Sequence, residues 1–166
     1  MCQIIRKELL PQNKSDKTAY ERELRNLSLL SHLKHPNIVE LFCCYSYRGC
    51  HNLIFPMVDF GDLRKLLKAE ERPILFTDTA LILAITDFSS ALDAMHNFFA
   101  KAVDIQLTGC HHDLAPRNIL VHKDSLLLAD FGLSKFKDIT QDSATQFKGS
   151  RGFYIAPECQ DVDGTL

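Results

Sequence analysis

Three oxygen-bearing side chains in one stretch of the chain have the chemistry needed to hold a divalent cation and to act on a hydroxyl group. Asp113 and Asn118 lie in the segment HHDLAPRNILV, and Asp130 follows the apolar run LLLA. Carboxylate and amide oxygens suit Mg²⁺, which proteins usually bind together with phosphate oxygens. A carboxylate near a hydroxyl can also accept its proton. These residue types therefore fit the requirements of phosphoryl transfer from a nucleotide.

The order and spacing of these residues resemble the signature motifs of eukaryotic-type protein kinases. Residues 111–118 are similar to the catalytic loop H-R-D-L-x-x-x-N, and Asp130 begins the metal-binding D-F-G. Ala156-Pro157-Glu158 resembles the A-P-E that ends the activation segment. A single Asp is usually a helix cap or a turn residue, but the three motifs together favour the kinase interpretation.

The resemblance implies a role for each residue of the catalytic loop. Asp113 takes the position of the catalytic base, and Asn118 and Asp130 take the positions of the Mg²⁺ ligands. Ala115 replaces the usual lysine, so Arg117 would contact the γ-phosphate instead. The resemblance therefore implies ATP and Mg²⁺ as cofactors and a protein as the substrate.

Protein kinases also pair a strand lysine with a helix glutamate to hold the α and β phosphates. Lys7 in IIRKEL takes the place of that lysine, with a solvent-facing lysine as the alternative. Counting nine residues back from His35 places the glutamate position at Asn26, whereas the pattern aromatic-x-x-Glu-x-x-x-Leu selects Glu23. We favour Glu23, because three extra residues add almost one helical turn and need not disturb it.

Residues 52–63 resemble the strand and hinge that receive adenine. The hinge would offer the C=O of Pro56 and the N–H of Val58, and proline lacks only the N–H. Phe55 would be the gatekeeper, and His111 and Phe131 would join the apolar column between the lobes. The resemblance assigns nucleotide binding to Lys7, Glu23, Pro56, Val58, Leu120 and Asp130.

Hydrophobic periodicity predicts the elements that must position these residues. Thr18 and Glu21 fit a capping box that opens a helix ending at His35-Pro36. The chain after Gly132 is polar and irregular up to Pro157, and glycine there permits unusual backbone angles. The other predicted elements are strands at 3–9, 38–45 and 52–57, a turn at Arg48-Gly49, helices at 63–67 and 81–95, and a hairpin at 119–121 and 126–128.

The pattern predicts a mixed domain, and the resemblance makes it an α+β, protein-kinase-like two-lobed fold. Residues 1–57 would form a small-lobe remnant and residues 58–166 a large-lobe remnant. No glycine-rich loop precedes Lys7 and no large-lobe helices follow Leu166, so we expect a kinase domain truncated at both ends.

The activity implied is an ATP-dependent protein Ser/Thr kinase, since GSRGFYIAPE resembles the Ser/Thr members, although it is one residue longer. Arg117 is instead typical of tyrosine kinases. His112 replaces the arginine that binds an activation-loop phosphate, and could do so only weakly near neutral pH. His112, Ala115 and the missing glycine loop favour the alternative, a pseudokinase or an inactive fragment acting as an interaction module.

Composition is that of one ordinary domain. The 166 residues are 46% hydrophobic and 24% charged, with a net charge of −2. The absence of a basic excess argues against nucleic acid, and no apolar run is long enough to span a membrane. The N-terminus has charges where a signal peptide would have an apolar stretch, which predicts an intracellular, cytoplasmic protein. The six cysteines form no CxxC pair, and we expect them to be reduced thiols.

Overall fold

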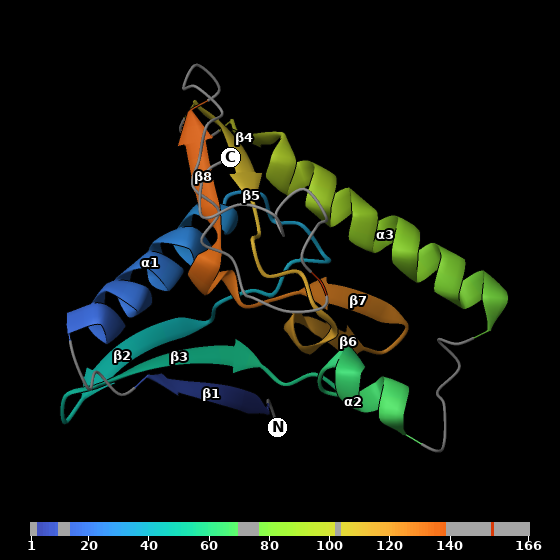
Figure 1. Cartoon of the computed structure of the whole chain (residues 1–166), viewed down its shortest axis with the longest axis horizontal. Helices are drawn as coiled ribbons and strands as arrows, with labels where there is room; N and C mark the ends of the chain where they lie inside the picture. Colours follow the sequence, from blue (N-terminus) through green and yellow to red (C-terminus); the bar gives the residue numbers. More distant parts are fainter. Residues whose placement is uncertain (1–2, 10–13, 70–76, 102–103, 139–153, 155–166) are drawn as a thin grey trace.

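In the part of the chain that the structure describes, three α-helices are interspersed among short strands (Figure 1). The structure is a computed structural model, which describes residues 3–9, 14–69, 77–101, 104–138 and 154. The elements are β1 (Ile4–Leu9), α1 (Lys14–Leu30), β2 (Cys43–Tyr47), β3 (Cys50–Pro56), α2 (Leu63–Lys68), α3 (Asp78–His96), β4 (Phe98–Ala100), β5 (Ile105–Cys110), the 3₁₀ turn η2 (Pro116–Asn118), β6 (Ile119–His122), β7 (Ser125–Leu128), the 3₁₀ turn η3 (Phe131–Leu133) and β8 (Lys135–Asp138).

The first sheet is antiparallel, with the strand order β1-β3-β2. Arg48 and Gly49 join β2 to β3 with φ values of 49° and 79°, and two positive φ values match the tight turn that suits a twisted hairpin. The predicted strand at 38–45 is wrong in its first half, because β2 begins only at Cys43. Ile38 instead forms an isolated bridge with Leu128, which ties the segment before β2 to the β6–β7 hairpin.

Helix α1 lies beside this sheet (Figure 1). It begins at Lys14, so the predicted capping box at Thr18 and Glu21 lies inside the helix rather than at its start. Residues 14–17 contain neither proline nor glycine, so nothing in their backbone stops the helix from extending. Regular helix ends at Leu30, and three further turn residues lead to Lys34, whose φ is 49°.

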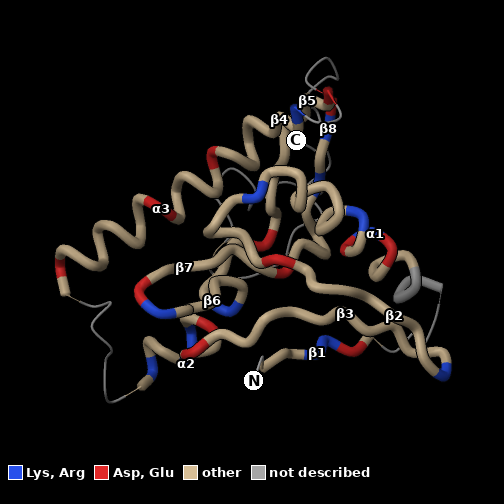
Figure 2. The backbone as a smooth tube through the Cα atoms, turned by 180° about the vertical axis from the view of Figure 1, so that it is seen from behind, with Lys and Arg blue, Asp and Glu red and all other residues tan. Residues whose placement is uncertain are grey.

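The second part of the chain contains α2, α3 and the β6–β7 hairpin, all of which the sequence predicted. Asp62 caps α2 by accepting a hydrogen bond from the N–H of Lys65 at 3.0 Å. Ile119 pairs with Leu128 and His122 with Ser125, so the hairpin turns at 123–124. Lysine, arginine, aspartate and glutamate are spread over many elements instead of gathering in one region of the backbone (Figure 2).

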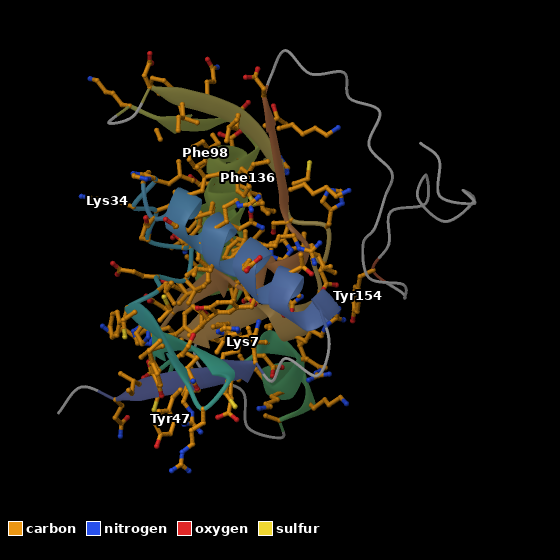
Figure 3. All side chains as sticks on the ribbon, turned by 90° about the vertical axis from the view of Figure 1, so that its left-hand side faces the viewer. Lys7, Lys34, Tyr47, Phe98, Phe136 and Tyr154 are labelled. Atoms are coloured by element: carbon orange, nitrogen blue, oxygen red, sulfur yellow. The ribbon has the colours of Figure 1, made fainter. Side chains whose placement is uncertain are left out.

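A third sheet, with the order β4-β5-β8, was not predicted. The chain after Gly132 is therefore not irregular throughout, because Lys135–Asp138 forms β8 and pairs with β5. The sequence KFKD is short and mostly polar, so its pattern does not distinguish a strand from a loop. Phe98 and Phe136 contact edge to face at the base of this sheet, with ring centroids 5.6 Å apart (Figure 3).

Gly109 permits the close packing of β5, β8 and α3. A Cβ at this position would lie 2.5 Å from Cε1 of Phe136 and 2.7 Å from the carbonyl oxygen of Met95. We expect Gly109→Ala to lower the free energy of unfolding by about 1–3 kcal/mol, because the backbone of α3 must shift. Urea unfolding measures the change. Gly132→Ala is the matched control, since its Cβ would meet no atom closer than 3.5 Å, and equal losses in the two variants would contradict the explanation.

One hydrophobic core joins α1, the first sheet, α3 and the β6–β7 hairpin. Phe131, in the turn after Asp130, is fully buried in it. The ends of the hairpin and the facing side of α1 are therefore anchored to the same packed interior. Its buried members are Tyr20, Leu27, Leu30, Ile38, Val39, Leu53, Leu66, Ala84, Phe88, Ala91, Met95, Val121, Leu126, Leu128, Ala129 and Phe131.

Candidate active site

The β6–β7 hairpin brings two of the predicted metal ligands to the same end of the molecule. Asn118 directly precedes β6, and Asp130 lies two residues after β7. The N–H of Ala129 donates to the carbonyl oxygen of Asn118 at 3.0 Å, which continues the ladder beyond the strands. The two residues are thus held side by side by backbone pairing.

The carboxylate of Asp113 is held by two side chains of the same loop. Arg117 donates to its Oδ1 at 2.5 Å, and the amide nitrogen of Asn118 donates to its Oδ2 at 2.8 Å. The same nitrogen also donates to the carbonyl oxygen of Asp113 at 2.8 Å. Because the side-chain nitrogen of Asn118 donates to Asp113, the Oδ1 atom of Asn118 is the one that could coordinate a cation.

His111 links this loop to the segment that contains Asp130. Its Nε2 donates to the carbonyl oxygen of Ala129 at 3.0 Å, and its Nδ1 accepts the N–H of Asp113 at 3.3 Å. These two partners together are satisfied by one neutral tautomer of the imidazole. The ring also packs edge to face on Phe131, with centroids 5.2 Å apart, so the two residues expected in an apolar column are in contact.

The backbone is left-handed at Asp130, whereas Gly132 does not use the unusual backbone angles that glycine permits. Asp130 has a φ of 64°, and His112 has a φ of 63°, whereas Gly132 has no left-handed conformation. Aspartate tolerates this region better than most residues because its short side chain can bond locally. Left-handed residues other than glycine often gather at functional sites. The Asp130 carboxylate contacts Lys7 of β1.

The ammonium of Lys7 lies between two carboxylates from different parts of the chain. Its Nζ is 2.7 Å from Oε1 of Glu23 on α1 and 3.1 Å from Oδ1 of Asp130. Figure 3 places Lys7 between the first sheet and α1. The Glu23 side chain is only 6% exposed, whereas that of Asp130 is 44% exposed. Asp130 therefore still has an accessible oxygen for a ligand, while Glu23 faces Lys7 inside the protein.

Burial and charge act on this group in opposite directions. Burial lowers the pKa of Lys7, but Glu23 and Asp130 outweigh that effect and raise it above its ordinary value. Burial raises the pKa of Glu23, and the nearby Lys7 offsets only part of that rise. The lysine is consequently a stable cation that the surrounding carboxylates keep in place.

Sequence reasoning missed two contacts that hold α1 against the rest of the site. The buried amide of Asn26 donates to the carbonyl oxygens of Phe131 and Ser134 at 2.8 and 2.9 Å. Tyr20 stacks on His51 of β3, with ring centroids 4.1 Å apart and planes 7° from parallel. Counting from His35 offers Asn26 only as a rival partner for the lysine. Its hydrogen-bond partners lie more than 100 residues away along the chain, so no local pattern reveals them.

The predicted hinge runs beside the hairpin. Pro56 ends β3 and pairs with Ile4, and Val58 is buried. Leu120 pairs with Leu127 and forms a bridge with Asp62 at the start of α2. The predicted hinge and the hairpin therefore meet next to the loop of Asp113 and Asn118. Contact of Pro56, Val58 and Leu120 with a nucleotide stays a prediction.

A family model described as the protein kinase domain matches residues 2–163. The chain belongs to the protein kinase family. It is 34% identical over 157 residues to Cell division control protein 2 homolog 3 of Trypanosoma brucei brucei, covering 94% of this chain and 46% of that protein. It is 31% identical over 158 residues to Serine/threonine-protein kinase 12 of Arabidopsis thaliana, covering 94% and 32%. It is 33% identical over 144 residues to Receptor-like protein kinase HSL1 of the same plant, covering 84% and 13%. The chain thus spans less than half the length of these kinases.

The kinase motif at the end of the activation segment, Ala156-Pro157-Glu158, lies outside the described residues, as does most of GSRGFYIAPE; Tyr154 is described and exposed. Among the described helices, none has the length and apolar character needed to cross a membrane.

Histidines give the kinase domain a predicted dependence on pH. Burial lowers the pKa of His111 from its ordinary value of 6.5, and burial followed by Lys135 lowers that of His112. Below pH 6.5 these histidines bind protons in the unfolded chain that they do not bind in the folded chain, so their contribution to stability falls as the pH falls. We expect a lower free energy of unfolding at pH 5.5 than at pH 7.5, by at most about 1.4 kcal/mol per histidine per pH unit.

Urea titrations at the two pH values measure this dependence. His111→Gln keeps one donor and one acceptor but does not titrate, so it should reduce the difference. Equal stability of the unmodified protein at pH 5.5 and pH 7.5 would contradict the lowered pKa values of His111 and His112.

Proposed function

We propose that this chain forms the nucleotide-binding and catalytic part of an ATP-dependent protein Ser/Thr kinase. The observation that best supports the proposal is the gathering of Lys7, Glu23 and Asp130 by ion pairs beside the loop of Asp113 and Asn118. These five residues come from β1, α1, the loop before η2, the end of η2 and the segment just after β7. Family membership alone would not favour catalysis over a binding shell, but a complete set of these groups does.

The proposed cofactors are ATP and Mg²⁺, and the residues fit such a cation. Within the described ranges no three His, Cys, Asp or Glu side chains gather closely enough to hold a metal ion. Mg²⁺ instead takes one or two protein oxygens together with substrate phosphates. Oδ1 of Asn118 and the accessible carboxylate of Asp130 would supply those two oxygens. The cation, when bound, neutralises phosphate charge during the transfer.

The protein's own groups would divide the remaining work. Asp113 would orient the substrate hydroxyl and accept its proton at a carboxylate oxygen. Arg117, which donates to Asp113, would also contact the γ-phosphate, as the resemblance to the family implies. Lys7, held by Glu23, would neutralise the α and β phosphates. Pro56, Val58 and Leu120 would contact adenine at the hinge.

The choice of serine and threonine hydroxyls rests on sequence similarity. GSRGFYIAPE resembles the Ser/Thr members, and one relative is named as a serine/threonine-protein kinase. We also propose that the lobes divide at 57–58, between the end of β3 and the start of α2. The described cysteines Cys43, Cys44, Cys50 and Cys110 are free thiols, which is typical of a reducing intracellular compartment.

Phosphoryl transfer from radiolabelled ATP tests the proposal. The full-length protein is incubated with Mg²⁺ and a mixture of serine, threonine and tyrosine peptides, and the labelled amino acids are identified. We expect label on serine or threonine, and none when EDTA removes the cation. Thermal shift with Mg-ATP is measured in parallel. Binding without transfer would overturn the kinase proposal in favour of a nucleotide-binding interaction module, and label on tyrosine alone would overturn the Ser/Thr assignment.

A further inference from the structure

The two carboxylates that flank Lys7 belong to separate elements. Glu23 lies on α1, and Asp130 immediately precedes η3. A Cβ on Gly132 would lie 3.5 Å from Oδ1 of Asp130 and 3.7 Å from Oε2 of Glu23, so helix and turn approach closely here. Two carboxylates so near one another repel, and Lys7, which pairs with both, offsets that repulsion. A hydrogen bond between α1 and η3 that involves no charged group would hold the two elements together as well.

Asn26 supplies that contact. It lies three residues after Glu23, so the two side chains share one face of α1. Its amide donates one hydrogen bond to the carbonyl of Phe131, the first residue of η3, and one to the carbonyl of Ser134, just after the turn. The N–H of Ser134 also donates to Phe131, so the amide closes both ends of the same turn. Asn26 is 6% exposed, and water therefore competes little for these bonds.

We propose that Asn26 is a positioning residue, which fixes α1 on the turn that follows Asp130 and so sets the separation of Glu23 and Asp130 around Lys7. This inference rests on the proposed function, since it concerns the site for Mg-ATP. Glutamate, the residue type that counting from His35 would require here, cannot do this work. A carboxylate would face two carbonyl oxygens and has no N–H to donate.

The test compares variants of the full-length protein that differ in donor capacity. Asn26→Asp is nearly isosteric but turns donors into acceptors, and Asn26→Ala removes them with less repulsion. Asn37→Asp is the matched control, because Asn37 is also buried and donates to one carbonyl, that of Leu126, away from the site. Affinity for Mg-ATP, the KM for ATP and kcat are measured together with hydrogen exchange of the Ser134 amide.

Both Asn26 variants should weaken Mg-ATP binding by about tenfold or more, the factor expected for two lost buried hydrogen bonds. KM should rise more than kcat falls, and the Ser134 amide should exchange faster. Asn37→Asp should change stability without these effects. A double-mutant cycle with Glu23→Gln should be non-additive, because Asn26 acts through Glu23.

Additive losses, or unchanged Ser134 exchange in a folded Asn26→Ala variant, would overturn the proposal. Hydrogen exchange needs no activity, so it can fail or succeed independently of phosphoryl transfer. Lack of Mg-ATP binding by the unmodified protein would instead overturn the proposed function. If Asn26→Asp does not fold, the decision rests on Asn26→Ala and the same amide.

Discussion

Asp113→Asn is expected to lower the rate of phosphoryl transfer by about 10²–10⁴-fold, the usual contribution of a general base. The asparagine has nearly the same shape and can still accept one hydrogen bond from Arg117 or Asn118, but it cannot accept the proton of the substrate hydroxyl. Affinity for Mg-ATP should change little, because Asp113 is not among the proposed metal ligands. Initial rates with radiolabelled ATP and nucleotide titrations separate the two effects.

Asp124→Asn is the matched control for this variant. Asp124 is exposed in the turn of the β6–β7 hairpin and loses the same charge without touching the loop. Its rate should equal that of the unmodified protein. Undiminished transfer by a folded Asp113→Asn protein would remove the residue from the mechanism.

Lys7→Met should have the largest effect on stability. The substitution leaves the Glu23 carboxylate buried without its cation, and breaking a buried pair from one side costs about 3–5 kcal/mol. We expect about 3 kcal/mol, the lower limit of that range, since the Lys7 side chain is 34% exposed and water can enter. Urea unfolding measures the loss. It should shrink as the pH falls, because burial already raises the pKa of Glu23 and protonation removes the unpaired charge.

Glu23→Gln in the Lys7→Met background should recover most of this loss, because the buried charge is then gone. Affinity for Mg-ATP should not recover, since the phosphates still lack their lysine. Lys68→Met, at an exposed position on α2, serves as the control for losing a lysine. A Lys7→Met protein as stable as the control would show that the pair contributes nothing to folding.

Local patterns were sufficient where a segment's own residues determine its structure. The β6–β7 hairpin and α2 were predicted because apolar spacing, turn residues and the Asp62 cap all lie within a few positions. The choice between Glu23 and Asn26 also followed a local pattern, and the structure places Glu23 against Lys7. Motifs in fixed order predicted which residues gather at the hairpin.

Long-range pairing set the limit of prediction. Strand β8 exists because Lys135–Asp138 pairs with β5. These four residues are mostly polar, and their sequence does not predict pairing with β5. The prediction of Ile38 as a strand residue was wrong for the same reason. Its only described backbone bridge is to Leu128, a residue far away along the chain. The left-handed residue of this segment is Asp130 rather than Gly132, and the ion pair of Asp130 with Lys7 is a long-range contact that no local pattern reveals.

Two contacts hold α1 near its middle. The Tyr20–His51 stack joins it to the first sheet, and the Asn26 amide joins it to the turn after Asp130. A small molecule that binds only when α1 is displaced must break the Tyr20–His51 stack and the two hydrogen bonds of the Asn26 amide. A compound that binds with α1 in place does not lose the free energy of these contacts. Inhibitor screens against this protein should therefore favour compounds that bind with α1 in the position described above.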